Sequence, residues 1–182
     1  MRPTTAILLG ALAAAAGLWL WSRSGAGQVI FVDAIESVLS GPRGIRNHNP
    51  GNIDWIANPA KRWRGMIRRE TPAEGGRFAV FDTTANGVRA IGEELKLDER
   101  RGLRTVATLI GGDPRIPGTG WAPSSENDTP AYVRAVSSSL HVAADDELDV
   151  RSYLPRLVAA IIQHENGVQP YAPDDLARWV NS

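Results

Sequence analysis

The chain has 182 residues, which is enough for one domain of ordinary size and an appendage. Lys and Arg number 20 and Asp and Glu number 20, so the zero net charge does not favour nucleic acid or acidic lipid as a partner. Cysteine is absent, which excludes disulfides, thiolate metal sites and cysteine nucleophiles. The six tryptophans are typical of flat apolar surfaces in a core or in a sugar-binding cleft.

The N-terminal segment differs in composition from the rest of the chain. Residues 5–21, TAILLGALAAAAGLWLW, carry no charge and lie between Arg2 and Arg23. Since about 20 apolar residues span a bilayer, this run predicts a transmembrane anchor at the short limit. Trp19 and Trp21 fit the outer membrane interface. A cleaved signal peptide and a buried core helix are the alternatives.

The composition divides the chain into three segments. Residues 1–27 hold the anchor and a Ser/Gly linker, and residues 28–42 hold an amphipathic helix just outside the membrane. Residues 43–182 form the globular domain, in which no further run is long and apolar enough to span a bilayer.

The globular domain predicts a mainly α (α+β) fold with a small β element near its start. A short strand is expected over residues 77–81, RFAVF. Helices are indicated by N-cap residues and by apolar residues three and four positions apart. They are expected after Asp82, over 105–110, from Thr129 and over 151–165.

The last predicted helix ends in a glutamate. Its apolar stripe advances by three or four residues and reaches Ile162, so Glu165 continues it towards the core. The negative end of the helix dipole and partial burial both favour the protonated carboxylic acid that a general acid requires. The alternative is that the stripe ends at Ile162 and Glu165 extends into water.

Three polar segments could line a site: residues 43–53, 121–129 and 163–171. In the second, Glu126 is another candidate catalytic carboxylate. The alternative is that Asp128 or the following threonine caps a helix, with Glu126 near its positive end. His48 and His164 lie in no metal-ligand motif, and no nucleotide-binding fingerprint is present. We therefore expect neither a metal nor a cofactor.

Taken in order, several short motifs resemble a family of phage proteins. They are RGIRNHNPGNI (43–53), WRG (63–65), FAVFDT (78–83), GVRAI (87–91), GLRTV (102–106), WAPSSENDTPAYV (121–133) and HENGVQPY (164–171). The family is described as virion or structural proteins with a lysozyme-like, murein-degrading domain. Its first motif usually reads GIRNNNPxNI, and here His48 replaces the middle asparagine.

The resemblance implies a lysozyme-like domain. In such enzymes the catalytic glutamate closes a helix in an ESG-like turn, and a polar segment follows it in the chain. Here HENG comes after NPGNI, so the order is reversed and we expect a circularly permuted arrangement. The last helix would then bring Glu165 against the loop 43–53.

The implied activity is cleavage of the bond between N-acetylmuramic acid and N-acetylglucosamine. Glu165 would be the acid, with Glu126 as its rival. A muramidase needs a second carboxylate, which Glu126 or Asp128 could supply, whereas a lytic transglycosylase does not. Amides suit sugar hydroxyl and acetamido groups, and aromatic rings stack on sugar faces. The expected substrate-binding residues are Asn47, Asn49, Asn52, Trp121 and Tyr171.

The expected partners are peptidoglycan glycan strands, the membrane through residues 5–21, and other virion proteins, with no specific nucleic acid. The domain would face the periplasm from the virion membrane or the host inner membrane. The alternative is a non-catalytic virion membrane or structural protein that keeps the fold for assembly, glycan binding or DNA delivery.

Overall fold

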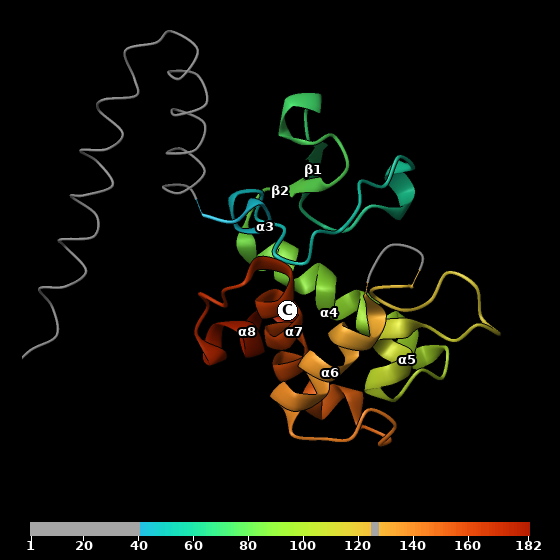
Figure 1. Ribbon diagram of the computed structural model, residues 1–182. Helices are drawn as coiled ribbons and strands as arrows, with labels where there is room; N and C mark the ends of the chain where they lie inside the picture. The colour runs from blue at the N-terminus through green and yellow to red at the C-terminus, as the bar shows by residue number, and fades with distance from the viewer. Residues whose placement is uncertain (1–40, 125–127) are drawn as a thin grey trace, which may run out of the picture. The chain divides into compact units, whose positions relative to one another are not determined.

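About half of the residues that the computed structural model describes, residues 41–124 and 128–182, lie in helices (Figure 1). The longer helices are α4 (Thr84–Arg100), α5 (Val106–Gly111), α6 (Thr129–Leu140), α7 (Val150–Asn166) and α8 (Pro173–Val180). The small β element is a two-stranded sheet. The predicted mainly α fold with a small β element near its start is therefore confirmed.

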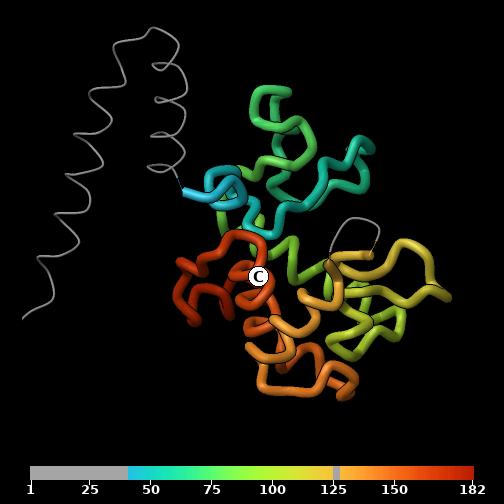
Figure 2. The backbone as a smooth tube through the Cα atoms, viewed as in Figure 1, coloured from blue at the N-terminus to red at the C-terminus, as the bar shows by residue number. Residues whose placement is uncertain are grey.

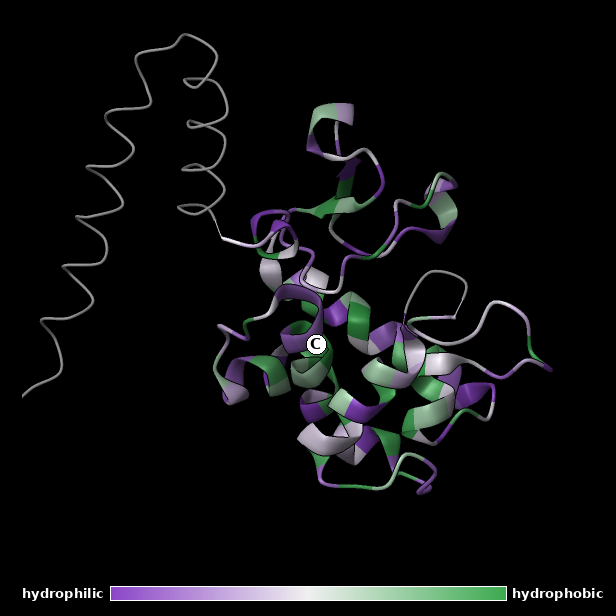
Figure 3. Ribbon diagram, viewed as in Figure 1, coloured by the Kyte–Doolittle hydropathy of each residue, from purple (hydrophilic) through white to green (hydrophobic). Residues whose placement is uncertain are grey.

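Helix α7 packs against α4, α6 and α8 and supplies much of the core. Its predicted apolar stripe is buried, because Leu154, Leu157 and Val158 are all at most 1% exposed. Burying each such side chain contributes roughly 1.5–3 kcal/mol. Gly167 ends the helix in the left-handed conformation (φ 69°), as the sequence predicts. Figure 3 shows that hydrophobic and hydrophilic residues alternate along these helices.

The other predicted helices also start at polar caps. The Thr83 side chain accepts a hydrogen bond from the Asn86 amide at the start of α4. Asp128 caps α6 by accepting from the Ala131 amide at 3.0 Å. This places Asp128 in the helix-capping role that was one of its two interpretations.

The two strands form an antiparallel hairpin. Strand β1 (Met66–Arg69) pairs with β2 (Ala79–Phe81), with Met66 opposite Phe81 and an irregularity after Met66. The sequence predicts β2 but not β1, and it does not predict α8. Met66, Ala79 and Phe81 bury against Ala90 of α4 in a small second cluster. We call residues 42–82 the hairpin lobe and residues 83–182 the helical body; Figure 2 shows the two side by side.

Residues 42–182 form one compact unit. Within the described part of the chain, no helix is long and apolar enough to cross a bilayer. The anchor predicted over residues 5–21 lies outside the described residues, and so does nearly all of the amphipathic helix predicted within 28–42.

Candidate functional site

The first polar segment forms a tight loop after the short helix α3 (Arg43–Arg46). Asn49 is fully buried and holds this loop together. Its Nδ2 donates to the carbonyl oxygens of Ile53 and Ala79, each at 2.9 Å, and its Oδ1 accepts from the Ile53 amide at 2.9 Å. Every strong hydrogen-bonding group of this side chain is therefore used within the fold.

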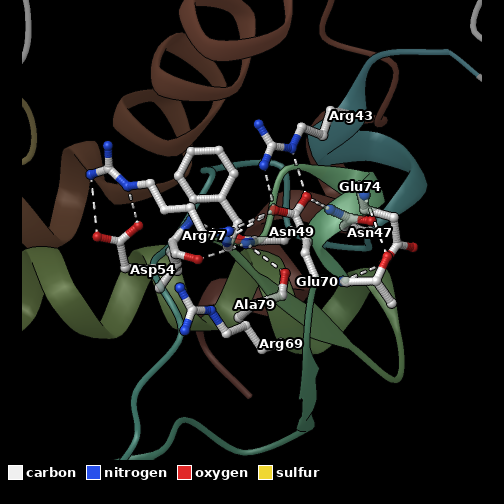
Figure 4. A network of polar contacts seen from close by, with 12 residues as sticks. Arg43, Asn47, Asn49, Asp54, Arg69, Glu70, Glu74, Arg77 and Ala79 are labelled. Atoms are coloured by element: carbon white, nitrogen blue, oxygen red, sulfur yellow. Dashed lines mark hydrogen bonds and ion pairs between the residues drawn. The ribbon is translucent and has the colours of Figure 1, made fainter.

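An ion pair between the partly exposed Arg43 and the buried Glu70 ties the same loop to the hairpin (Figure 4). Glu70 accepts from Arg43 Nε at 2.6 Å, from Asn47 Nδ2 at 2.6 Å and from the Phe78 amide at 3.0 Å. Burial alone would raise the pKa of Glu70, but these donors together hold its pKa below the usual value. Asn47 thus positions a structural carboxylate.

Two glycines allow the loop to approach the end of α7 and the indole of Trp121. A Cβ on Gly44 would lie 2.6 Å from Asn166 Oδ1, and a Cβ on Gly51 would lie 2.7 Å from the Trp121 ring. Asn166 also donates from Nδ2 to the Pro50 carbonyl at 2.7 Å. The loop is therefore pinned against the HENG turn.

Glu165 lies where this loop, the segment before α6, α6 itself and the end of α7 meet. Its Oε2 accepts from Asn52 Nδ2 at 3.0 Å. Its Oε1 accepts from Tyr132 Oη at 2.9 Å and from Trp121 Nε1 at 3.2 Å. Asn52 adopts a left-handed backbone (φ 51°), which asparagine tolerates better than most residues. The predicted contact between the loop 43–53 and Glu165 is confirmed.

Tyr132 supports the carboxylate from the core side. The residue is 2% exposed, and its ring stacks on that of His164 with 3.6 Å between centroids. Burial first, and then the charge of Glu165 and the hydrogen bond to it, raise the pKa of Tyr132. The hydroxyl therefore stays protonated and remains a donor to Glu165.

A cavity of about 330 Å³ opens between the hairpin lobe and the helical body. Three carboxyl groups line it, those of Asp54, Glu94 and Glu165. Asp54 forms an ion pair with Arg77 at 2.6 Å (Figure 4), and both side chains are more than half exposed. Such exposed pairs contribute little to stability.

Glu94 is a cavity residue that the sequence analysis missed. It lies in the middle of α4 and is half-buried. Burial, and then the negative charge of Asp98, raise the pKa of Glu94. A signal was present in the sequence, because Glu94 and Asp98 lie three and seven residues after the buried Ile91, on the apolar face of the helix.

The predicted site residues divide into three groups. Asn52, Trp121 and Glu165 line one cavity. Asn47, Asn49 and Tyr171 do not line it, and Tyr171 packs edge-on against Trp179 with 5.7 Å between ring centroids. Glu126 lies outside the described residues. Over residues 41–124 and 128–182, no group of three or more His, Asp or Glu side chains could hold a metal ion.

No protein-family model matches the chain. The chain is similar to "Protein P5" of Pseudoalteromonas phage PM2, with 29% identity over 137 residues. The similarity covers 75% of this chain and 78% of that protein. The predicted link to phage proteins is supported to this extent.

Proposed function

We propose that the protein cleaves murein glycan strands in the cavity between the hairpin lobe and the helical body, with Glu165 as the acid. One observation carries the proposal: Glu165, Trp121 and Asn52 come from distant segments and line one cavity. An acid, an aromatic face and an amide are the groups that a glycosidase needs for protonation, stacking and acetamido recognition.

The cavity volume fits this use. At about 330 Å³ it lies at the lower end of small-ligand sites, which span roughly 300–1,000 Å³. Its two walls come from the hairpin lobe and the helical body, and we propose that the glycan strand lies between them. We include in the proposal a circularly permuted lysozyme-like arrangement, because the loop 43–53 meets the HENG turn.

We propose that the reaction is that of a lytic transglycosylase, in which Glu165 acts as the acid. Glu165 gives its proton to the glycosidic oxygen as the bond from that oxygen to C1 breaks. A hydroxyl of the same muramic acid residue then forms a bond to C1 and returns its proton to Glu165. Hydrolysis instead needs an ionised second carboxylate. Besides Glu165, the carboxyl groups that line the cavity are Asp54, in an exposed ion pair with Arg77, and the half-buried Glu94, so the end groups of the products decide between the two reactions.

The test uses the full chain in mild detergent with purified murein sacculi. We expect release of soluble fragments that end in anhydro-muramic acid, identified by mass spectrometry; reducing ends would instead indicate a hydrolase. Glu165→Gln should abolish release, and the matched control Glu147→Gln, on an exposed side chain, should not. No release by the parent protein would refute the enzyme proposal, and full activity of Glu165→Gln would refute the role of Glu165.

A second candidate is a non-catalytic glycan-binding or assembly protein. The observation that favours it is that three side chains of the fold hold Glu165, so this carboxylate also bridges separate segments. A structural protein would keep such a bridge. In that case the parent would bind sacculi without releasing fragments, and Glu165→Gln would lower the melting temperature.

Membrane attachment through residues 5–21, with the domain in the periplasm, belongs to the same proposal. It places the cavity next to murein. Protease added to host spheroplasts should then remove the domain from the membrane fraction, whereas protection of the domain from protease would place it on the other side.

A further inference from the structure

The zero net charge of the chain hides an uneven distribution. The hairpin lobe, residues 42–82, contains eight Lys or Arg and four Asp or Glu, which gives it a net charge of +4. The helical body, residues 83–182, contains ten Lys or Arg and fourteen Asp or Glu, which gives it a net charge of −4. Residues 1–41 hold two of each sign. The two walls of the cavity therefore belong to parts of opposite charge.

The acidic residues of the hairpin lobe already have partners. Glu70 pairs with Arg43, Glu74 with Arg68 and Asp54 with Arg77, while Asp82 accepts from Asn86 and Thr83. Among these partners only Arg68 belongs to the run KRWRGMIRR, residues 61–69, which we call the basic run.

Four charges of the basic run lack an ion pair within the described residues: those of Lys61, Arg62, Arg64 and Arg69. Lys61, Arg64 and Arg69 are exposed. Arg62 lies over the Trp55 ring at 4.0 Å, and Arg64 donates to the neutral Asn86 side chain at 3.1 Å. The half-buried Arg62 also donates to the carbonyl oxygens of Ile56 and Ala57, so these contacts orient the guanidinium groups without neutralising them.

A buried cation lies beneath the basic run. Arg89 of α4 is 9% exposed and donates from Nη2 to the Arg64 carbonyl at 3.2 Å, and its Nε is buried without an acceptor. No carboxylate within the described residues forms an ion pair with it. Burying an unpaired charge is unfavourable. An anion bound over Arg64 would offset part of that cost.

We propose that the basic run binds the carboxylate groups of a murein strand and so aligns the strand with the cavity. This inference rests on the proposed function, because it names the polymer that the cavity takes. The hairpin lobe, which carries the basic run, also supplies the cavity wall of Asn52, Asp54 and Arg77. Murein carries carboxylates on its peptide stems, at intervals along the glycan.

The charge of the helical body separates this polymer from nucleic acid. Duplex DNA carries a phosphate charge about every 1.7 Å of its axis. A strand of that density in the cavity would face Glu94 and Glu165 on the opposite wall and the net −4 of the body. A polymer with sparse carboxylates can meet the basic run while its neutral sugars pass those glutamates.

The experiment measures binding of the full chain to murein sacculi by sedimentation, in a Glu165→Gln background that prevents cleavage. The test variant combines Lys61→Glu, Arg64→Glu and Arg69→Glu. The matched control combines Arg100→Glu, Arg104→Glu and Arg134→Glu, which make the same charge change on exposed residues of the helical body. Thermal melts check that both variants fold.

We expect the test variant to bind sacculi about tenfold more weakly, with a smaller salt dependence, and the control to bind within about twofold of the parent. Amidating the sacculus carboxylates should weaken parent binding to a similar extent. Equal binding by all three proteins, or equal loss in both variants, would overturn the inference. The parent could instead bind duplex DNA or anionic phospholipid vesicles more tightly than sacculi. If the test variant lost that binding, the surface would be assigned to nucleic acid or to the membrane.

The result is separable from the enzyme proposal. If the parent releases no fragments but binding depends on the basic run, the binding surface stands and catalysis fails. If murein is cleaved and binding ignores the basic run, only this inference fails.

Discussion

Replacing Tyr132 with phenylalanine removes one hydroxyl and leaves the ring that fills the core. The lost bond joins Tyr132 Oη to Glu165 Oε1 at 2.9 Å. A typical hydrogen bond contributes about 0.5–1.5 kcal/mol and one to a charged group about 1.5–3 kcal/mol; Glu165 is only half-buried, so water replaces part of the loss. We expect the free energy of unfolding to fall by about 1.5 kcal/mol at pH 7, or roughly 3–5 °C in melting temperature.

The same variant also tests the direction of the Tyr132 pKa shift, when stability is measured in alkaline solution. The folded-state pKa of Tyr132 is raised above its ordinary value of 10.0, so the unfolded state ionises at a lower pH than the folded state. The stability that the protonated hydroxyl contributes is therefore fully present below pH 10 and is lost as pH rises above 10. At pH 11 the unfolded parent gains about 1.4 kcal/mol from ionisation that the folded parent cannot match. Phenylalanine has no such ionisation, so the difference between parent and variant should nearly vanish at pH 11.

The assay is chemical denaturation of the parent and of Tyr132→Phe at pH 7 and pH 11. The control is Tyr153→Phe, because the Tyr153 hydroxyl makes no hydrogen bond within the described residues. The control should change stability by less than about 0.5 kcal/mol. An unchanged difference between the two pH values would show that Tyr132 ionises freely. Equal stability at pH 7 would refute the bond to Glu165.

Three further substitutions test the surroundings of the cavity. Gly51→Ala places a Cβ 2.7 Å from the Trp121 ring, so we expect a loss of about 1–3 kcal/mol in urea unfolding; full stability would contradict the close packing of loop and indole. Glu70→Gln breaks the pair with Arg43, which is partly exposed, so we expect a loss of about 2–3 kcal/mol at pH 7. Because the folded-state pKa of Glu70 is lowered, this difference should shrink as pH falls through that pKa, and a loss that is constant down to acid pH would argue against it. For Glu94 the folded-state pKa is raised, so the stability that the protonated carboxyl group contributes is lost as pH rises. Glu94→Gln should therefore raise the melting temperature at pH 8 and not at pH 4. A lower melting temperature of the variant at pH 8 would contradict the burial of Glu94.

Local patterns were sufficient for most of the helices and for one contact between distant segments. The apolar spacing of α4 and α7, the polar residues at their starts and Gly167 at the end of α7 are properties of a few neighbouring residues. The meeting of Asn52 and Glu165, 113 positions apart, was predicted from the resemblance, which placed both turns in one site.

Tertiary structure decided what the polar residues of those turns do. Asn47, Asn49 and Asn52 are alike in the sequence, but Asn49 bonds only to backbone groups, Asn47 holds Glu70, and Asn52 reaches the cavity. Glu94 became a cavity residue because α4 passes beneath the loop. The separation of charge between lobe and body is likewise absent from the net charge of zero. A repeating apolar pattern determines which face of a helix a side chain lies on. The hydrogen-bond partner of an amide or a carboxylate depends instead on which distant segment packs against it, and the neighbouring residues in the sequence do not determine that segment.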